Sequence, residues 1–268
     1  MPSPIESGPY LRRGGTTGTG PTLLLLHGLG QTADLWTGVL ELLDKHRSGR
    51  WIVIDLPGHG RSARLPDYSY ESMTRAVAEV LDPDEPLIIL GHSLGGVIAI
   101  MLGSGRYGLD IQAVCALGVK PDPWPEGADD VARAMATTPP QAFPSKAVAT
   151  DHLLSLISAQ AATDAATPTV RRWWDTATAE HDGAWTLCLD QQVYAVGTHD
   201  MQKVVSQCRA PLILAAGTLD PLGSPEHLLE LDRHAVLLDG EDHYPHLHNP
   251  ESLTPLIELL SIHATDNT

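Results

Sequence analysis

Short runs of apolar residues alternate with amphipathic stretches along most of the chain. Each run is short and is bounded by Gly, Pro or Asp. This pattern is typical of strands whose two faces are both buried in a parallel sheet. The predicted strands are Thr22–Leu26, Trp51–Asp55, Leu87–Leu90, Val114–Leu117, Leu212–Ala216 and Val236–Leu238.

Amphipathic segments between these runs predict helices. Strands that alternate with helices indicate βαβ units, so we expect an α/β fold with a mostly parallel sheet flanked by helices on both faces. The glycine-rich segment Gly14–Gly20 is predicted to be a turn or a flexible loop. The predicted helices are Asp34–Leu43, Tyr70–Leu81, Ser93–Leu102, Pro225–Leu231 and Pro250–His263.

The stretch Lys120–Val205 breaks the alternation. It is rich in Ala and Thr, its prolines gather near its start, and it holds no convincing strand run. Because it follows one predicted strand and precedes another, we predict an inserted helical cap at 120–205 between two parts of one core, 1–119 and 206–268. Helices inserted at the carboxyl ends of strands lie where ligands bind in open α/β sheets.

Composition narrows the classes of partner. The 268 residues are 43% hydrophobic, which is enough for a sizeable core, and the formal charge is −16. Such an acidic surface repels phosphate backbones and anionic lipid, so we expect no nucleic-acid or membrane partner. The start of the chain shows no apolar signal region, and the three cysteines are widely spaced. We therefore expect a cytoplasmic monomer or homodimer that acts on a small molecule.

The motif Gly91-His92-Ser93-Leu94-Gly95 directly follows a predicted strand and opens a predicted helix. A nucleophile on such a turn adopts a strained backbone, and flanking glycines are needed because side chains there would collide with neighbouring elements. The turn lifts the serine oxygen clear of the sheet, and the helix start supplies free N–H groups. The motif therefore predicts Ser93 as a nucleophile.

The loop His27-Gly28-Leu29-Gly30 follows another predicted strand. An enzyme that transfers an acyl group must stabilise an oxyanion, and backbone N–H groups are suitable donors. We predict that the backbone N–H groups of Leu29 and Leu94 form this oxyanion hole.

Asp220 and His243 both lie in loops that follow predicted strands, at the edge of the sheet where Ser93 emerges. The chain order Ser, Asp, His is the order expected for this kind of fold. His243 is predicted to accept the proton of Ser93, and Asp220 to orient the imidazole. Asp122, which follows a different strand, is the alternative acid; it is otherwise a turn or helix-cap residue.

These motifs resemble the α/β-hydrolase superfamily over nearly the whole chain apart from the insertion. The resemblance implies the α/β-hydrolase fold, a Ser93–His243–Asp220 triad and hydrolysis without a metal or an organic cofactor. The sequence departs from the family pattern at Asp242, where the family has Gly before the catalytic histidine. The matching segments are HGLG at 27–30, DLPGHGRS at 55–62, GHSLGG at 91–96, GTLD at 217–220 and DHYPHLHNPE at 242–251.

Two other interpretations use the same residues. The segment 28–33 matches a GxGxxA dinucleotide-binding pattern, and Asp55 is placed where a ribose-binding acid would be. The histidines of 242–248, with Asp242, resemble a set of metal ligands, although their irregular spacing around Pro245 argues against it. The dinucleotide interpretation leaves GHSLGG and the Asp220 and His243 pair unexplained, so we expect neither a dinucleotide nor a metal.

The insertion contributes Trp, Leu and Ala more than charge. We therefore predict an ester substrate of medium size and largely apolar character. Trp124, Trp173 and Trp174 are predicted to bind it, although adjacent tryptophans on one helix cannot both face the same way. The alternatives on the same triad are thioester hydrolysis, carbon–carbon bond hydrolysis, a lyase or cyclase reaction, and a protein that only binds its ligand.

Overall fold

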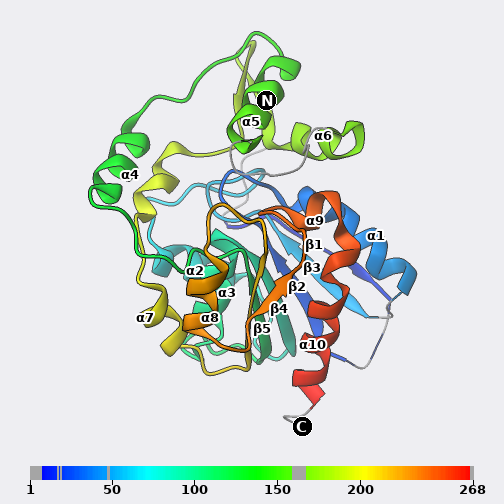
Figure 1. Ribbon diagram of the computed structural model, residues 1–268. Helices are drawn as coiled ribbons and strands as arrows, with labels where there is room; N and C mark the ends of the chain where they lie inside the picture. The colour runs from blue at the N-terminus through cyan, green and yellow to red at the C-terminus, as the bar shows by residue number, and fades with distance from the viewer. Residues whose placement is uncertain (1–7, 17, 19, 47–48, 159–166, 266–268) are drawn as a thin grey trace.

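The computed structural model describes residues 8–265, apart from 17, 19, 47–48 and 159–166. Its main sheet consists of β1 Leu11–Gly15, β2 Thr22–Leu26, β3 Arg50–Ile54, β4 Leu87–His92, β5 Ile111–Leu117, β8 Leu212–Gly217 and β9 Val236–Leu238. The strand order is β1-β3-β2-β4-β5-β8-β9, and only β1 pairs antiparallel among these strands. The predicted α/β fold with a mostly parallel sheet is thus confirmed (Figure 1).

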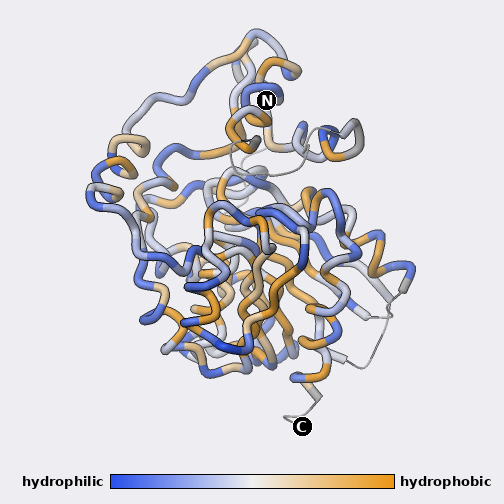
Figure 2. The backbone as a smooth tube through the Cα atoms, viewed as in Figure 1, coloured by the Kyte–Doolittle hydropathy of each residue, from blue (hydrophilic) through white to orange (hydrophobic). Residues whose placement is uncertain are grey.

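Helices cover both faces of this sheet, which explains why the strand sequences are apolar without alternation. Along β2, Leu23 and Leu25 belong to one buried cluster and Leu24 and Leu26 to another, and all four are 0% exposed. Hydrophobic residues are concentrated in and around the sheet (Figure 2). The first cluster includes α1 Thr37–His46 and α10 Thr254–Thr265; the second includes α2 Tyr70–Glu79, α3 Leu94–Leu102 and α8 Pro225–Leu231.

Two predicted helices are each a 3-10 turn followed by an α-helix. The turn η1 Ala33–Trp36 leads into α1, and η4 Pro250–Leu253 leads into α10. A further short helix, α9 Pro245–His248, precedes η4. These short turns bring the chain round to the helix that packs on the sheet.

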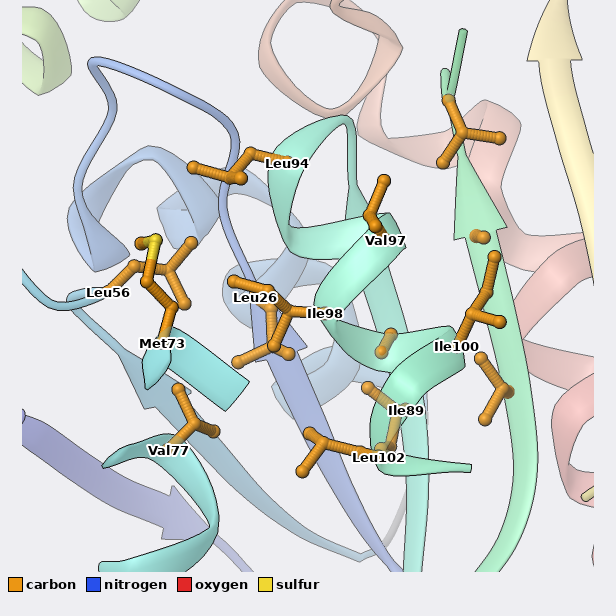
Figure 3. Packing of buried hydrophobic residues seen from close by; sticks show 14 of the residues in the cluster. Leu26, Leu56, Met73, Val77, Ile89, Leu94, Val97, Ile98, Ile100 and Leu102 are labelled. Atoms are coloured by element: carbon orange, nitrogen blue, oxygen red, sulfur yellow. The ribbon is translucent and has the colours of Figure 1, made fainter. Parts of the chain in front are cut away.

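The helix α3 lies in the middle of the core. Its Ile98 and Leu102 pack beside Leu26 and Ile89 of the sheet and close to Met73 of α2 (Figure 3). These five side chains are at most 1% exposed, and burying each one contributes about 1.5–3 kcal/mol relative to exposure. The N-terminus of α3, where Ser93 lies, is therefore held by a helix that packs in the core.

The segment between β5 and β8 contains helices and one hairpin. In Figure 1, α4, α5 and α6 lie beyond the sheet on the side where α9 also lies. The elements are α4 Ala128–Thr137, α5 Lys146–Ser158, α6 Pro168–Trp174, η2 Asp175–Ala177, β6 Thr178–His181, β7 Ala184–Leu187, η3 Gln191–Val196 and α7 Met201–Ser206.

Two details of the sequence prediction are corrected here. The insertion is not purely helical, because β6 and β7 pair as an antiparallel hairpin. The first glycines of Gly14–Gly20 end β1 rather than form a loop, and the Trp51 ring occupies the space where a side chain of Gly14 would lie.

Within the described residues, every helix is too short or too polar to cross a lipid bilayer.

Candidate active site

Ser93 stands at a sharp turn between β4 and α3. Its φ of 51° and ψ of −116° lie outside the ordinary regions for an L-residue. The Ser93 N–H donates to the carbonyl of Leu117 at 2.8 Å, which ties the turn to β5. A Cβ on Gly91 would lie 2.2 Å from the Gly95 carbonyl, and a Cβ on Gly95 would lie 2.5 Å from the Leu26 carbonyl. The close approach of these backbones explains both glycines of the motif.

His243 and Asp220 form a buried pair next to this turn. The His243 Nδ1–H donates to Asp220 Oδ2 at 2.8 Å, and the two residues are 3% and 6% exposed. Nδ1 then carries the proton, so Nε2 of the neutral ring is free to accept one. Gly118 makes room for the pair, since its Cβ would lie 3.2 Å from the imidazole.

Asp122, the alternative acid, has different partners. One carboxylate oxygen contacts His227 of α8, and the other accepts the Ser224 N–H at 3.1 Å and faces Lys120 at 3.5 Å. Asp122 therefore links the start of the insertion to the N-terminus of α8. The structure pairs His243 with Asp220 instead.

The loop that contains Leu29 passes directly beside the nucleophile. A Cβ on Gly28 would lie 3.2 Å from Ser93 Cβ. In the described part of the chain, the N–H groups of Leu29 and Leu94 have no hydrogen-bond acceptor. Both residues line the cavity that contains Ser93. The arrangement leaves these two donors for a ligand oxygen.

Two buried histidines hold the loops of the site in place. The Leu56 N–H donates to His27 Nε2 at 2.9 Å, so His27 Nδ1 carries the proton and donates to the Gly28 carbonyl. The His92 Nε2–H donates to the His243 carbonyl at 2.8 Å. Burial lowers the pKa of His92 well below its usual value, and the neighbouring His246 and His243 lower it further. His92 thus stays neutral and supports the histidine loop rather than acting as a base.

The dinucleotide interpretation finds no support in the surroundings of Asp55. Its carboxylate accepts the Ala33 N–H at 2.7 Å and the Arg61 backbone N–H at 2.9 Å, and it forms an ion pair with the Arg61 guanidinium. The side chain is 0% exposed. Asp55 therefore organises the loop that follows β3 and has no oxygen left for a ribose.

The residues proposed as metal ligands also have other roles. His248 Nε2 lies 3.3 Å from both Glu241 and Asp242, and Asp242 accepts the Tyr244 N–H at 2.8 Å. His246 is 0% exposed and its ring lies against His92. No group of three candidate ligands meets the geometry of a metal site among the described residues.

Ser93 and His243 open into a cavity of about 610 Å³. Its walls come from the sheet edge, α4 and the segment 193–199, and apolar side chains dominate them. Trp124 lines this cavity, and its role in substrate binding stays a prediction. The polar residues of the wall beyond Ser93 and His243 are Tyr70, Lys120, Tyr194, Thr198 and His199.

Trp173 and Trp174 lie elsewhere, which corrects the prediction that they bind substrate. Trp174 is 1% exposed and belongs to a separate apolar cluster with Leu35 and Tyr244. Trp173 packs against this cluster and lies near Gly38. Both fasten α6 to the core, so neither side chain is available to the cavity.

Comparison with known proteins gives relatives among esterases. A pimeloyl-[acyl-carrier protein] methyl ester esterase from Sodalis glossinidius is 27% identical over 246 residues, which cover 88% of this chain and 91% of that protein. The enzyme of the same name from Methylococcus capsulatus is 41% identical, but the match covers 32% of each chain. Protein phosphatase methylesterase 1 from Bos taurus is 33% identical over 37% of this chain and 28% of its own length.

Solved structures share the fold. A thioesterase domain from the curacin biosynthetic pathway superposes with a TM-score of 0.71 at 22% identity and covers 92% of this chain and 94% of its own. An esterase from Mycobacterium tuberculosis gives 0.68 at 24% identity, over 94% and 90% of the two chains. The sequence model of the alpha/beta hydrolase family matches residues 23–254. The chain therefore belongs to the α/β-hydrolase family.

Proposed function

We propose that the protein is a serine carboxylesterase in which Ser93, His243 and Asp220 form the catalytic triad. The observation that carries the proposal is the buried 2.8 Å contact between His243 Nδ1 and Asp220, beside a strained Ser93 that shares its cavity. The named relatives that hydrolyse methyl esters support the same class of reaction.

The reaction begins when Ser93 Oγ gives its proton to His243 Nε2 and attacks the carbonyl carbon of the ester. The carbonyl oxygen becomes an oxyanion and accepts hydrogen bonds from the Leu29 and Leu94 N–H groups. Asp220 stabilises the imidazolium and keeps it oriented. The bond to the alcohol oxygen then breaks, and His243 returns the proton to that oxygen, which leaves an acyl-Ser93 ester.

The second half repeats these steps with water. His243 removes a proton from water, whose oxygen attacks the acyl carbon, and the bond to Ser93 Oγ breaks as the proton returns to it. The products are a carboxylic acid and free enzyme. Every proton transfer uses His243, so the mechanism needs no additional base.

The walls of the cavity favour a substrate of medium size. Its volume of about 610 Å³ falls in the range of ordinary small-molecule sites. The face of α4 toward the cavity presents Ala128, Val131 and Met135, and this apolar surface suits a hydrocarbon chain. We infer an ester with a largely aliphatic acyl or alcohol portion.

The test combines a fluorophosphonate probe with a panel of para-nitrophenyl esters, thioesters and carbon–carbon substrates. We expect wild type and the exposed-site control Ser206→Ala to take up one probe molecule and to hydrolyse esters. Ser93→Ala takes up none and loses about 10⁴-fold or more in kcat. Ester turnover that survives in Ser93→Ala, or activity confined to thioesters or carbon–carbon bonds, would overturn the proposal.

A further inference from the structure

One wall of the cavity carries a positive charge that the ester mechanism does not use. Of the described residues that line the cavity, Lys120 alone has a formal charge at neutral pH. Lys120 lies just beyond the carboxyl end of β5, at the start of the insertion, and its side chain is 25% exposed. Most other side chains of the cavity are apolar, so this ammonium is the charged group that a ligand in the cavity meets.

The protein neutralises this ammonium only in part. Its nearest acceptor is Asp122 Oδ2, at 3.5 Å, which is the long end of a hydrogen bond. The same Asp122 carboxylate accepts the Ser224 N–H and pairs with His227. Lysine has three donors, and Asp122 is the one hydrogen-bond acceptor that the described residues give to Nζ. Donors of Lys120 therefore remain for a ligand in the cavity.

Aromatic side chains hold the ammonium on the cavity side. Lys120 Nζ lies 5.7 Å from the centre of the Trp124 ring, at the range of a cation–π contact. The Trp124 ring packs edge-on against His199, and His199 Nδ1 pairs with the Tyr70 hydroxyl at 2.9 Å. This chain of contacts joins α2, the start of the insertion and the segment after η3. It fixes the wall around Lys120.

His199 adds no charge to this wall. Burial lowers its pKa to about 4, and the nearby Lys120 ammonium contributes to the lowering. At neutral pH the imidazole is therefore uncharged and does not repel the ammonium. Among the described residues that line the cavity, Lys120 is thus the one charged side chain at this end.

Lys120 and the reacting groups line one cavity of about 610 Å³. Gly118 faces the His243 ring, and the Lys120 backbone is two residues further on, at most about 7 Å along the chain. A substrate whose ester lies at Ser93 therefore reaches the Lys120 end of the cavity when an aliphatic spacer follows its wall.

We propose that Lys120 binds a carboxylate at the far end of the substrate, so that the preferred substrates are half-esters of aliphatic dicarboxylic acids. This inference rests on the proposed esterase function and specifies its substrate class. Lys120 shares its single charge with Asp122, so it suits a singly charged carboxylate better than a phosphate monoester with a charge near −2. The aliphatic spacer matches the apolar side chains of α4 and η3.

The test compares mono-para-nitrophenyl esters of glutarate, adipate and suberate with neutral para-nitrophenyl esters of matched length. We expect wild type to prefer the charged esters. Lys120→Met should lower kcat/KM on the charged esters by about tenfold or more and change the neutral esters by less than about twofold. Lys120→Arg should restore most of the loss, and the exposed-site control Lys203→Met should behave as wild type.

A second measurement separates this inference from the proposed function. Monomethyl suberate is titrated calorimetrically into Ser93→Ala and into the double variant with Lys120→Met. Binding that depends on Lys120 supports the carboxylate site even if the wild-type protein hydrolyses no ester. The absence of hydrolysis would overturn only the esterase proposal. Equal loss on charged and neutral esters, or equal binding by both variants, would overturn the carboxylate site while Ser93-dependent esterase activity stands.

Discussion

Ser93 keeps a backbone conformation that costs an L-residue about 1–3 kcal/mol. Three hydrogen bonds hold it there: its N–H donates to Leu117, and its carbonyl accepts the N–H groups of Gly96 and Val97. The helix α3, in which every residue but Met101 is buried, adds packing that a relaxed turn would disturb. These hydrogen bonds and the packing of α3 together maintain the strained backbone, and the Ser93 side chain remains at the cavity surface.

The role of Asp220 is testable at this scale by substitution with an isosteric amide. Asp220→Asn removes the acceptor that fixes the proton on His243 Nδ1, so the ring is left in the wrong tautomer or orientation. We expect kcat on a neutral ester to fall by about 10⁴-fold with little change in KM. Stopped-flow or steady-state hydrolysis assays measure the effect.

The matched control is Asp122→Asn, which changes the alternative acid. Because Asp122 contacts His227 and the Ser224 N–H rather than His243, we expect kcat on the neutral ester to change by less than about threefold. If the two variants exchanged these effects, the assignment of the acid would be wrong.

The reactive residues could be named from the sequence because each follows an apolar strand run. Asp220 and His243 meet in the structure as their positions in such loops imply. The residues of the insertion could not be placed in this way. Lys120 lines the cavity and Trp174 packs in a separate apolar cluster, and the path of the insertion over the sheet decides which of them faces the cavity. No periodicity in the sequence encodes this path.

At the scale of elements, the crossing of β2, β4 and α3 depends on glycine. Gly95 approaches the Leu26 and His27 carbonyls so closely that an added methyl group would lie within 2.6 Å of both. Rigid backbone surrounds it on that side, so no rotamer change relieves the contact. The packing of α3 on the sheet and the position of Ser93 therefore both require a glycine at position 95.

We predict that Gly95→Ala destabilises the protein by about 3 kcal/mol or more and lowers Tm by at least about 5 °C. Activity should fall with it, since α3 must move to accept the methyl group. Differential scanning calorimetry measures the shift. Gly20→Ala is the control, because an added Cβ there meets nothing within 4 Å and we expect no loss of Tm. A Gly95→Ala protein as stable as wild type would show that the backbone contact is relaxed.

The elements of the core could be predicted because burial on both faces produces unbroken apolar runs. The hydrophobic pattern did not predict the hairpin β6–β7, because its strands are only half-buried and mix polar with apolar side chains. Its turn did leave a signal, Asp182-Gly183, whose φ values of 52° and 80° are those of a tight hairpin turn. An Asp-Gly pair between short strands favours a hairpin even where hydrophobicity does not.

At the scale of the whole molecule, histidines without charge are distributed through the interior. Burial is the main cause that lowers the pKa in each of them. His59 falls to about 3 and His199 to about 4. The others with lowered pKa values are His27, His92 and His246. All would be ordinary titrating histidines in the unfolded chain. At mildly acidic pH the folded protein therefore binds several fewer protons than the unfolded chain.

This arrangement gives stability a pH dependence with a definite sign. Below the ordinary histidine pKa of 6.5, the unfolded chain takes up protons that the folded protein does not. The free energy of unfolding therefore falls as pH drops from about 6.5 towards 4, by up to about 1.4 kcal/mol per pH unit for each such histidine. Above pH 6.5 these groups are neutral in both states and contribute no slope.

The contribution of one histidine is measurable through His246, whose ring nitrogens have no hydrogen-bond partner among the described residues. In the His246→Leu variant, the unfolded chain has one fewer histidine that takes up a proton. We therefore expect the slope of unfolding free energy against pH between 6 and 4.5 to fall by about 1.4 kcal/mol per pH unit. At pH 7.5 stability should be unchanged or higher, because two buried polar atoms without partners are removed. Urea titrations across this pH range measure both values.

The control is the exposed His234→Asn, which should keep the wild-type slope. An unchanged slope in His246→Leu would mean that His246 takes up a proton in the folded protein, which would place a buried positive charge beside His92 and His243.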